Sequence, residues 1–168
     1  VGIVDGVDFM HTGLVRKVDA ESIKMSLEHN KIVLLSPLGF SPTGQAFNLA
    51  YEDVACSTAT ALKADKLIFL SSVDRLVDAE GLPIAEIALP ELSKLTGDDG
   101  LPPGELRSLL ATAGKAVKLG VNRVHILPHN RDGAVLEELF THDGVGTMIV
   151  ASDIENLREA NMDDVGGI

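Results

Sequence analysis

Two polar residues lie where a short strand should pass into a helix. Asn48 ends the apolar stretch around Phe47, and Glu52 opens the helical pattern of residues 51–62. A carboxamide and a carboxylate at such a corner would face the same crevice as the free amide groups of the helix, where they could bind a polar ligand. Alternatively, Asn48 stabilises the turn and Glu52 only interacts favourably with the helix dipole. The residues alone leave both interpretations open.

Three other residues could support nucleophilic or metal chemistry, but their positions argue against it. Cys56 is the single cysteine and stands in the small-residue stretch ACSTATAL, where a buried apolar role is expected rather than a nucleophile. His125 and His129 are four residues apart, but on a strand and its following loop that spacing does not place both rings on one face. We therefore expect no metal site.

Common phosphate-binding and hydrolase motifs are absent from the sequence. It contains no GxxxxGK[ST], GxGxxG, HExxH or GxSxG pattern. The GVGT stretch at residues 144–147 has two glycines, which on their own are more typical of a turn than of a phosphate cradle.

The elements that must position these residues alternate between strand and helix. Apolar runs predict buried strands at residues 31–36, 66–70, 122–127 and 147–151. Helical patterns cover residues 20–30, 51–62, 105–119, 133–140 and 153–161. This order predicts an α/β three-layer sandwich with a mainly parallel sheet. Ligands of such sheets bind beyond the carboxyl ends of the strands, which directs attention to the loops after Ser36, Leu70 and Leu127.

The remaining segments are less regular. Residues 1–19 alternate around Gly6 and Gly13, which predicts strands joined by tight turns, with Asp19 preceding the first helix. A Pro/Gly-rich loop should lead into a short strand near Phe47. Residues 81–87 suggest a short strand or arm and residues 89–95 one or two helical turns. The stretch TGDDGLPPG, residues 96–104, predicts a loop or lid.

Composition narrows the classes of partner. The 168 residues carry 25 Asp and Glu against 14 Lys and Arg, a net charge of −11, which disfavours nucleic acid and anionic membranes. One cysteine, no signal peptide and no long apolar run predict a cytoplasmic protein that does not span a membrane. The chain starts inside an apolar run and ends at MDDVGGI, so we expect it to be part of a longer protein.

Longer stretches resemble a known family. FNLAYEDVACSTATALKADKLIFLSSVDRLVD resembles the segment of amino-acid kinase family proteins, acetylglutamate kinase above all, that runs from the substrate-binding Asn through a helix to a strand and a nucleotide loop. LEELFTHDGVGTMIV resembles the end of the same fold. The resemblance implies that residues 1–151 form the carboxyl-terminal part of an amino-acid kinase-like domain. Residues 152–168 would then form a linker helix and the start of an acetyltransferase domain.

Two further stretches, GVDFMHTGLVRKVD and NMDDVGGI, are similar to the bacterial N-acetylglutamate synthases. That resemblance implies a parent enzyme of arginine biosynthesis that uses acetyl-CoA and L-glutamate, with no cofactor in this segment. It further implies a homo-oligomer whose kinase-like domain is catalytically silent and binds L-arginine as a feedback inhibitor.

Departures from the kinase pattern agree with a silent domain. Kinases of this group carry Asp in the nucleotide turn where this chain has Ser72, and Gly where it has Arg75. Their phosphoryl-binding Lys on the long helix is replaced by Arg107 or Ser108. Asn48, Glu52, Ser72, Arg75 and Arg107 are therefore candidates for a degenerate substrate and nucleotide site, and no catalytic residue is expected in this segment.

Resemblance to arginine-sensitive kinases implies an effector site near the THDGVGT turn. A guanidinium has five donors and no acceptor, and Asp143 would supply the anion while Gly144 and Gly146 leave the backbone open. DGVG is also an ordinary turn sequence. Two alternatives stay open: an acetylglutamate kinase fragment that phosphorylates N-acetylglutamate with ATP, and an oligomerisation module without a ligand.

Overall fold

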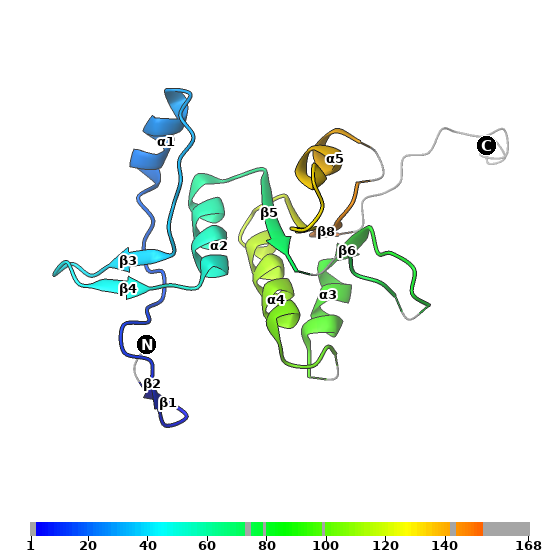
Figure 1. Cartoon of the computed structure of the whole chain (residues 1–168), viewed down its shortest axis with the longest axis horizontal. Coiled ribbons are helices and arrows are strands. Elements are labelled where there is room, and N and C mark those ends of the chain that lie inside the picture. Colours follow the sequence, from blue (N-terminus) through cyan, green and yellow to red (C-terminus); the bar gives the residue numbers. More distant parts are fainter. Residues whose placement is uncertain (1–2, 73–74, 79, 99, 142–143, 153–168) are drawn as a thin grey trace, which may run out of the picture.

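A four-stranded sheet lies at the centre of the fold (Figure 1). The computed structural model describes residues 3–72, 75–78, 80–98, 100–141 and 144–152. The sheet contains, in spatial order, β5 (Lys66–Ser71), β7 (Arg123–Pro128), β8 (Thr147–Val150) and β6 (Glu86–Ala88). β5 is parallel to β7 and β6 is parallel to β8, whereas β7 and β8 are antiparallel. The predicted, mostly parallel sheet is confirmed, with one antiparallel junction that was not predicted.

Helices cover both faces of this sheet, so the predicted three layers are present. Along β7, Val124 and Ile126 point into the larger core, beneath α2 (Tyr51–Leu62), α3 (Leu89–Thr96) and α4 (Glu105–Lys118). Leu127 packs on the opposite face with Ala134 of α5 (Ala134–Phe140). This alternation follows from the two-residue period of a strand.

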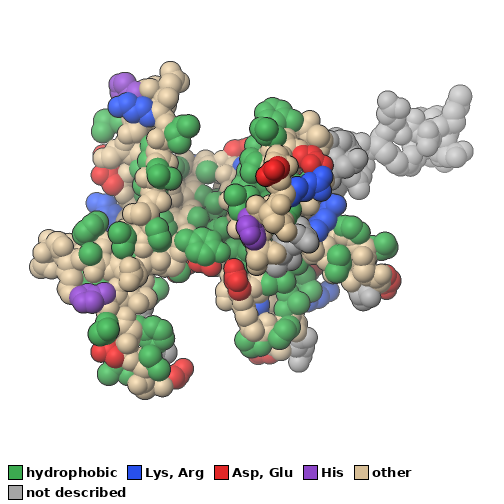
Figure 2. All heavy atoms as spheres, viewed as in Figure 1, with side chains coloured by type: hydrophobic (Ala, Val, Ile, Leu, Met, Phe, Trp, Pro, Cys, Tyr) green, Lys and Arg blue, Asp and Glu red, His purple; other side chains and the backbone are tan. Residues whose placement is uncertain are grey.

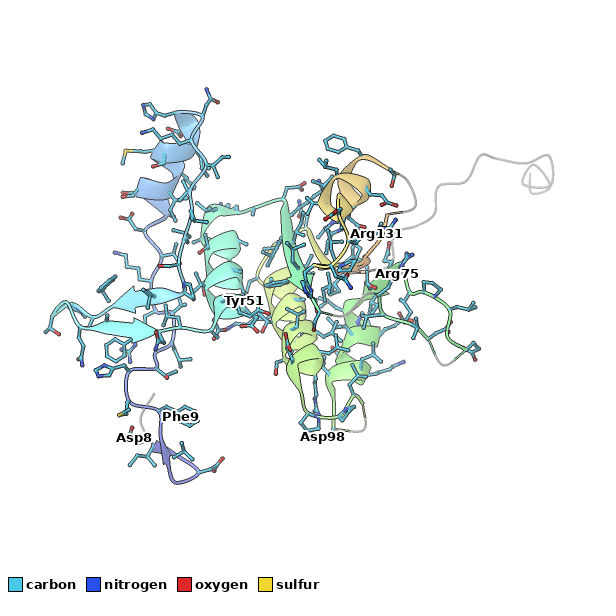
Figure 3. The ribbon with its side chains drawn as sticks, in the orientation of Figure 1. Asp8, Phe9, Tyr51, Arg75, Asp98 and Arg131 are labelled. Carbon is cyan, nitrogen blue, oxygen red and sulfur yellow. The ribbon has the colours of Figure 1, made fainter. Side chains whose placement is uncertain are left out.

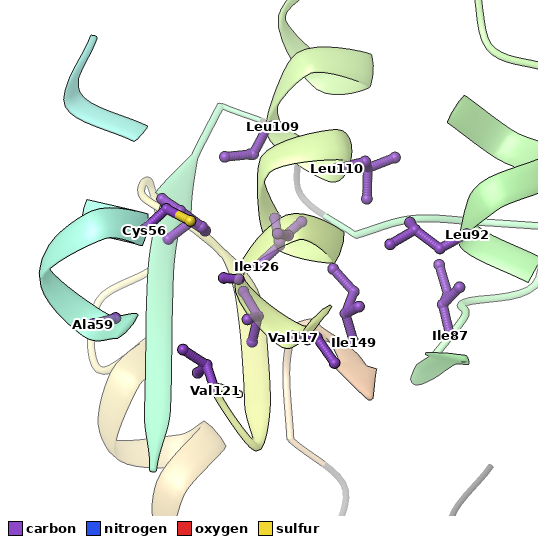
Figure 4. Close-up of a cluster of buried hydrophobic side chains, with 14 residues drawn as sticks. Cys56, Ala59, Ile87, Leu92, Leu109, Leu110, Val117, Val121, Ile126 and Ile149 are labelled. Atoms are coloured by element: carbon purple, nitrogen blue, oxygen red, sulfur yellow. The ribbon is translucent and has the colours of Figure 1, made fainter. Parts of the chain in front are cut away.

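The larger core depends mainly on α4. Its buried residues recur at the spacing of one helix face, and Leu109 and Leu110 are 1% and 0% exposed. Figure 4 shows them in the same cluster as Ile126, Ile149 and Leu92, which come from the sheet and α3. Burying one leucine side chain contributes about 1.5–3 kcal/mol. This face therefore fixes α4, and with it the segments at its ends, against the sheet.

The amino-terminal part lies on the other side of α2 (Figure 1). It contains the hairpin of β1 (Ile3–Val4) and β2 (Val7–Asp8), then α1 (Ala20–Glu28), then the hairpin of β3 (Leu38–Phe40) and β4 (Ala46–Asn48). The predictions that Asp19 precedes a helix and that a short strand includes Phe47 are confirmed, and the Asp19 carboxylate accepts the Ser22 N–H at 3.2 Å. The partner strand β3 was predicted as loop.

One strand prediction was wrong. Residues 31–36 form no ladder with any strand in the described part of the chain, and Ile32 and Leu34 are 97% and 95% exposed. An apolar run becomes a buried strand only where neighbouring strands accept its backbone hydrogen bonds. Val33 and Leu35 instead line an apolar groove against α2. Apolar side chains are also exposed elsewhere in this amino-terminal part, as Figure 2 shows.

Other predicted segments agree with the structure or fall outside it. Residues 81–87 include the start of β6, residues 89–95 lie in α3, and α5 begins after Gly133. The predicted helix at 153–161 and nearly all of the predicted linker, 152–168, lie outside the described residues. Within the described ranges, none of the helices is long and apolar enough to cross a membrane.

Candidate functional site

The predicted nucleotide turn after β5 and the predicted effector turn before β8, far apart in the sequence, lie at the same edge of the sheet. β5 and β7 are parallel, so their carboxyl ends, Ser71 and Pro128, are neighbours. The antiparallel β8 begins there as well, because Thr147 pairs with Ile126. The loop after β5 and the turn before β8 therefore meet at the edge where ligands of α/β sheets bind. The backbone N–H of His129 donates to the Ser71 carbonyl oxygen at 2.9 Å and joins the two strand ends.

A buried carboxylate organises the turn before β8. Glu138 of α5 accepts a hydrogen bond from His125 Nδ1 at 2.7 Å through Oε1. Its Oε2 accepts the backbone N–H groups of Val145 and Gly146 at 2.8 and 3.0 Å. The side chains of Glu138 and His125 are each only 7% exposed. One carboxylate thus connects α5, β7 and the turn.

The electrostatics of this cluster favour an ionised Glu138. Burial alone would raise its pKa, but the hydrogen bonds from His125, Gly146 and Val145 outweigh burial, so the pKa of Glu138 lies below its ordinary value of 4.5. His125 Nε2 is buried and has no hydrogen-bond partner. The bond to the Glu138 carboxylate requires a proton on Nδ1, which donates it to Oε1.

Gly144 and Gly146 let the turn pack closely against its neighbours. Gly144 has a φ of +55°, and a Cβ there would lie 2.6 Å from Glu138 Oε2. A Cβ on Gly146 would overlap the Ile126 carbonyl oxygen and the Leu127 side chain. The predicted open backbone is therefore wrong for Gly146, which is buried and whose N–H is engaged by Glu138. Asp143, the predicted anion, lies outside the described residues.

The candidate nucleotide turn begins at the same edge. Ser72 follows β5 directly and is exposed, and Arg75 is half-buried, with an Nε that is buried and has no hydrogen-bond partner (Figure 3). The nearby segment after β7 carries Arg131, whose guanidinium Nη2 donates to both Glu137 carboxylate oxygens at 2.7 Å. A side chain therefore stands at the position where the kinase pattern has Gly.

Arg107 binds backbone carbonyl groups rather than facing the strand ends as a free cation. Its Nε donates to the Thr96 carbonyl oxygen at 3.0 Å and its Nη1 to that of Leu101 at 3.2 Å. Its Nη2 lies 3.7 Å from the exposed carboxylate of Asp98, labelled in Figure 3. The guanidinium thus binds both sides of the predicted loop of residues 96–104, and these contacts occupy its Nε and Nη1 donors.

Asn48 ends β4 with an exposed side chain, and its backbone is bound to the segment of residues 11–13. The Asn48 backbone N–H donates to the His11 carbonyl oxygen at 2.7 Å, and its own carbonyl accepts the Gly13 N–H at 2.8 Å. Glu52 is half-buried in the first turn of α2, and partial burial together with the negative charges of Glu52 and Glu105 raises the pKa of Tyr51. This environment is acidic, which disfavours the phosphate groups of a nucleotide.

The surroundings of Cys56 and His129 indicate structural roles. Cys56 is 1% exposed, and burial raises the pKa of its thiol, so the thiol stays neutral and shielded. His129 Nδ1 lies 2.8 Å from the Ser71 carbonyl oxygen. Throughout the described ranges, there is no group of three His, Cys, Asp or Glu residues arranged to hold a metal ion.

Glu138 is the main site residue that sequence reasoning missed. It follows Glu137 in a helical pattern, and two consecutive glutamates suggest a solvated surface. The available signal was its spacing from Ala134, because residues four apart lie on the same face of a helix. Ala134 is 3% exposed, so Glu138 lies on the buried face while Glu137 lies toward solvent.

The family model described as "Amino acid kinase family" matches residues 2–128. The amino-acid acetyltransferase of Ralstonia nicotianae is 57% identical over 169 residues, which cover 100% of this chain and 37% of that protein. The amino-acid acetyltransferase of Azotobacter vinelandii is 46% identical over 172 residues, covering 100% and 38%. The chain therefore spans little more than a third of the length of these curated relatives.

Solved structures give the same grouping. The N-acetylglutamate synthase from Neisseria gonorrhoeae, complexed with coenzyme A and L-arginine, matches with a TM-score of 0.85 and 34% identity over 98% of this chain and 38% of that chain. A carbamate kinase from Giardia matches with a TM-score of 0.63 at 17% identity, over 80% of this chain and 48% of that chain, and shows the shared fold alone. With the family model covering most of its length, this chain belongs to the amino acid kinase family.

Proposed function

We propose that this chain is the carboxyl-terminal part of the kinase-like domain of an N-acetylglutamate synthase, in which it binds L-arginine as a regulatory ligand. The parent enzyme would transfer the acetyl group of acetyl-CoA to L-glutamate in the cytoplasm, with that reaction carried by parts outside this chain. Similarity to amino-acid acetyltransferases over 100% of the chain supports the assignment, as does the Neisseria synthase with coenzyme A and L-arginine.

The site residues support a domain without kinase activity. Phosphoryl transfer depends on positioning and on positive charge near the transferred group. Arg107 is held by the carbonyl groups of Thr96 and Leu101, and Arg75 occupies the place of a glycine. Besides burial, the carboxylates of Glu52 in α2 and Glu105 in α4 raise the pKa of Tyr51, and the same negative charges would repel phosphate. These features weaken both the positioning and the positive charge that phosphoryl transfer needs, which supports a domain without kinase activity.

The observation that carries the arginine proposal is the Glu138 carboxylate beneath the turn of residues 144–146. It engages the N–H groups of Val145 and Gly146 and fixes the turn at the ligand-binding edge. For a guanidinium, such a turn would offer backbone carbonyl oxygens and the carboxylate of Asp143. Glu138 is thus a positioning residue for the effector site.

Activity assays on the intact protein test this proposal. We expect acetyl-CoA-dependent acetylation of L-glutamate that L-arginine inhibits, and no ATP-dependent phosphorylation of N-acetylglutamate. Measured phosphorylation would instead identify an acetylglutamate kinase. Acetylation without any arginine effect would leave the domain as an assembly module, whose removal should then dissociate the homo-oligomer we expect.

A further inference from the structure

A second groove, away from the sheet edge, collects positive charge on an acidic protein. Its volume is about 280 Å³, and it lies between residues 15–18, α2 and the end of α4. Arg16, Lys17 and Lys115 all line it. The whole chain has only 14 Lys and Arg against 25 Asp and Glu, so a groove lined by three cations and no acidic residue stands out from the overall composition.

Within the described part of the structure, the lining of this groove contains no acidic side chain, and Arg16, Lys17 and Lys115 take part in none of the ion pairs. The ion pairs found there use Lys66, Arg107, His125 and Arg131. Two carboxylates act on neighbouring groups without lining the groove. Hydrogen bonds from Ser22 and then the charge of Lys17 lower the pKa of Asp19, and the charge of Asp53 acts on the Cys56 thiol against that of Lys115. The lining itself carries three positive charges and no negative charge.

Helix electrostatics do not explain the whole cluster. Lys115 lies in the last turn of α4, where a cation interacts favourably with the helix dipole. Arg16 and Lys17 belong to no helix and come from a segment far away in the sequence. Two independent segments thus bring cations to one groove, and the dipole accounts for only one of them.

The groove floor suits a compact ligand. Cys56 is 1% exposed and its thiol is neutral, so the floor is apolar there, while the neighbouring Ser57 is half-buried and carries a hydroxyl group. Ligand pockets usually have volumes of roughly 300–1,000 Å³, so this groove is at the lower limit.

We infer that this groove binds a small dianion, a dicarboxylate or a phosphate compound, through Arg16, Lys17 and Lys115. The Arg16 guanidinium can pair with a carboxylate or phosphate through two parallel hydrogen bonds. The two lysines add point charges that a single carboxylate would not neutralise, which selects for a ligand with two negative groups.

Isothermal titration calorimetry on the intact protein tests this inference with two probes, inorganic pyrophosphate and glutarate. We expect saturable binding of at least one probe. Arg16→Gln/Lys17→Gln and Lys115→Gln should each weaken it by about tenfold or more, because each removes direct charge contacts. Saturation by pyrophosphate alone would identify a phosphate compound as the ligand, and saturation by glutarate alone a dicarboxylate.

Lys118→Gln provides the matched control, because Lys118 lies in the same last turn of α4 but does not line the groove. It should leave binding unchanged. Arg16, Lys17 and Lys115 are all exposed, so none of these substitutions should unfold the protein, and the double variant and Lys115→Gln test the groove independently from its two sides. Absence of saturable binding by either probe at about 10 mM, or equal weakening by Lys118→Gln and Lys115→Gln, would overturn the inference.

Discussion

His125 on β7 and Glu138 on α5 form a buried hydrogen bond of 2.7 Å across the smaller layer of the fold. The same carboxylate accepts two backbone N–H groups from the turn that begins β8. The orientation of the turn beside the carboxyl ends of β5 and β7 therefore depends on one ionised side chain. Packing, charge and the proposed arginine site are coupled at this point.

Replacing Glu138 should cost more than replacing its neighbour. Glu138→Gln removes a buried charge that three donors require, and we expect a loss of about 2–4 kcal/mol in the free energy of unfolding. Glu137→Gln breaks only the exposed pair with Arg131, which should cost about 1 kcal/mol or less. Urea unfolding of both variants measures the difference. Equal losses would contradict the role assigned to Glu138.

Lowering the pH should remove the contribution of the ionised Glu138 carboxylate to the free energy of unfolding. Its pKa is depressed in the folded state, so its stabilising effect is complete above its ordinary value of 4.5 and is lost as the pH falls through the lower folded pKa. The difference in unfolding free energy between the wild type and Glu138→Gln should therefore narrow below about pH 4.5. Urea titrations between about pH 3 and pH 7 follow it. A difference that widened toward low pH would show the opposite sign.

Gly146→Ala should be strongly destabilising, because the new methyl group would overlap the Ile126 carbonyl oxygen and Leu127. We expect a loss of about 2–4 kcal/mol in stability, since a backbone atom cannot move aside as a flexible side chain can. Gly104→Ala is the control, because nothing lies within 4 Å of a Cβ at that glycine. Thermal unfolding of the two variants should differ clearly, and similar melting temperatures would argue against the close packing.

Arg107→Lys should loosen the loop of residues 96–104 while keeping the charge. A lysine cannot reproduce the two divergent hydrogen bonds to Thr96 and Leu101. Limited proteolysis with an enzyme specific for aspartate should cleave this loop several-fold faster than in the wild type. Arg123→Lys, at an exposed position, should leave the rate unchanged. An unchanged cleavage rate for Arg107→Lys would show that the hydrogen bonds of Arg107 to Thr96 and Leu101 do not hold the loop in place.

Much of the fold was predictable because its elements carry strong local patterns. β5, β7 and β8 have apolar runs, and α2, α4 and α5 have buried faces at helical spacing. Residues 31–36 have the same apolar character yet form no strand, since pairing depends on neighbours that local composition does not specify. The antiparallel direction of β8 relative to β7 could not be predicted either, because an apolar run is compatible with both parallel and antiparallel pairing.

The site was only partly predictable. The predicted strand order directed attention to the loops after Ser36, Leu70 and Leu127. The first of these does not follow a strand, whereas β5 ends at Ser71 and β7 at Pro128, close to the predicted positions. The role of Arg107 was not predictable, because a guanidinium can reach either a ligand or a nearby backbone and only geometry decides. Gly146 was predicted to leave the backbone open to a ligand. The structure instead shows that glycine is needed there because a side chain would overlap Ile126 and Leu127.

Binding of L-arginine to the intact protein tests the central claim most directly. Thermal unfolding should be measured with L-arginine and, as control, with L-citrulline, which has nearly the same shape but carries a neutral ureido group in place of the charged guanidinium. We predict a melting temperature that rises and saturates with L-arginine, no comparable rise with L-citrulline, and a weakened response in Glu138→Gln. No shift at saturating L-arginine, or an equal shift with L-citrulline, would contradict the account.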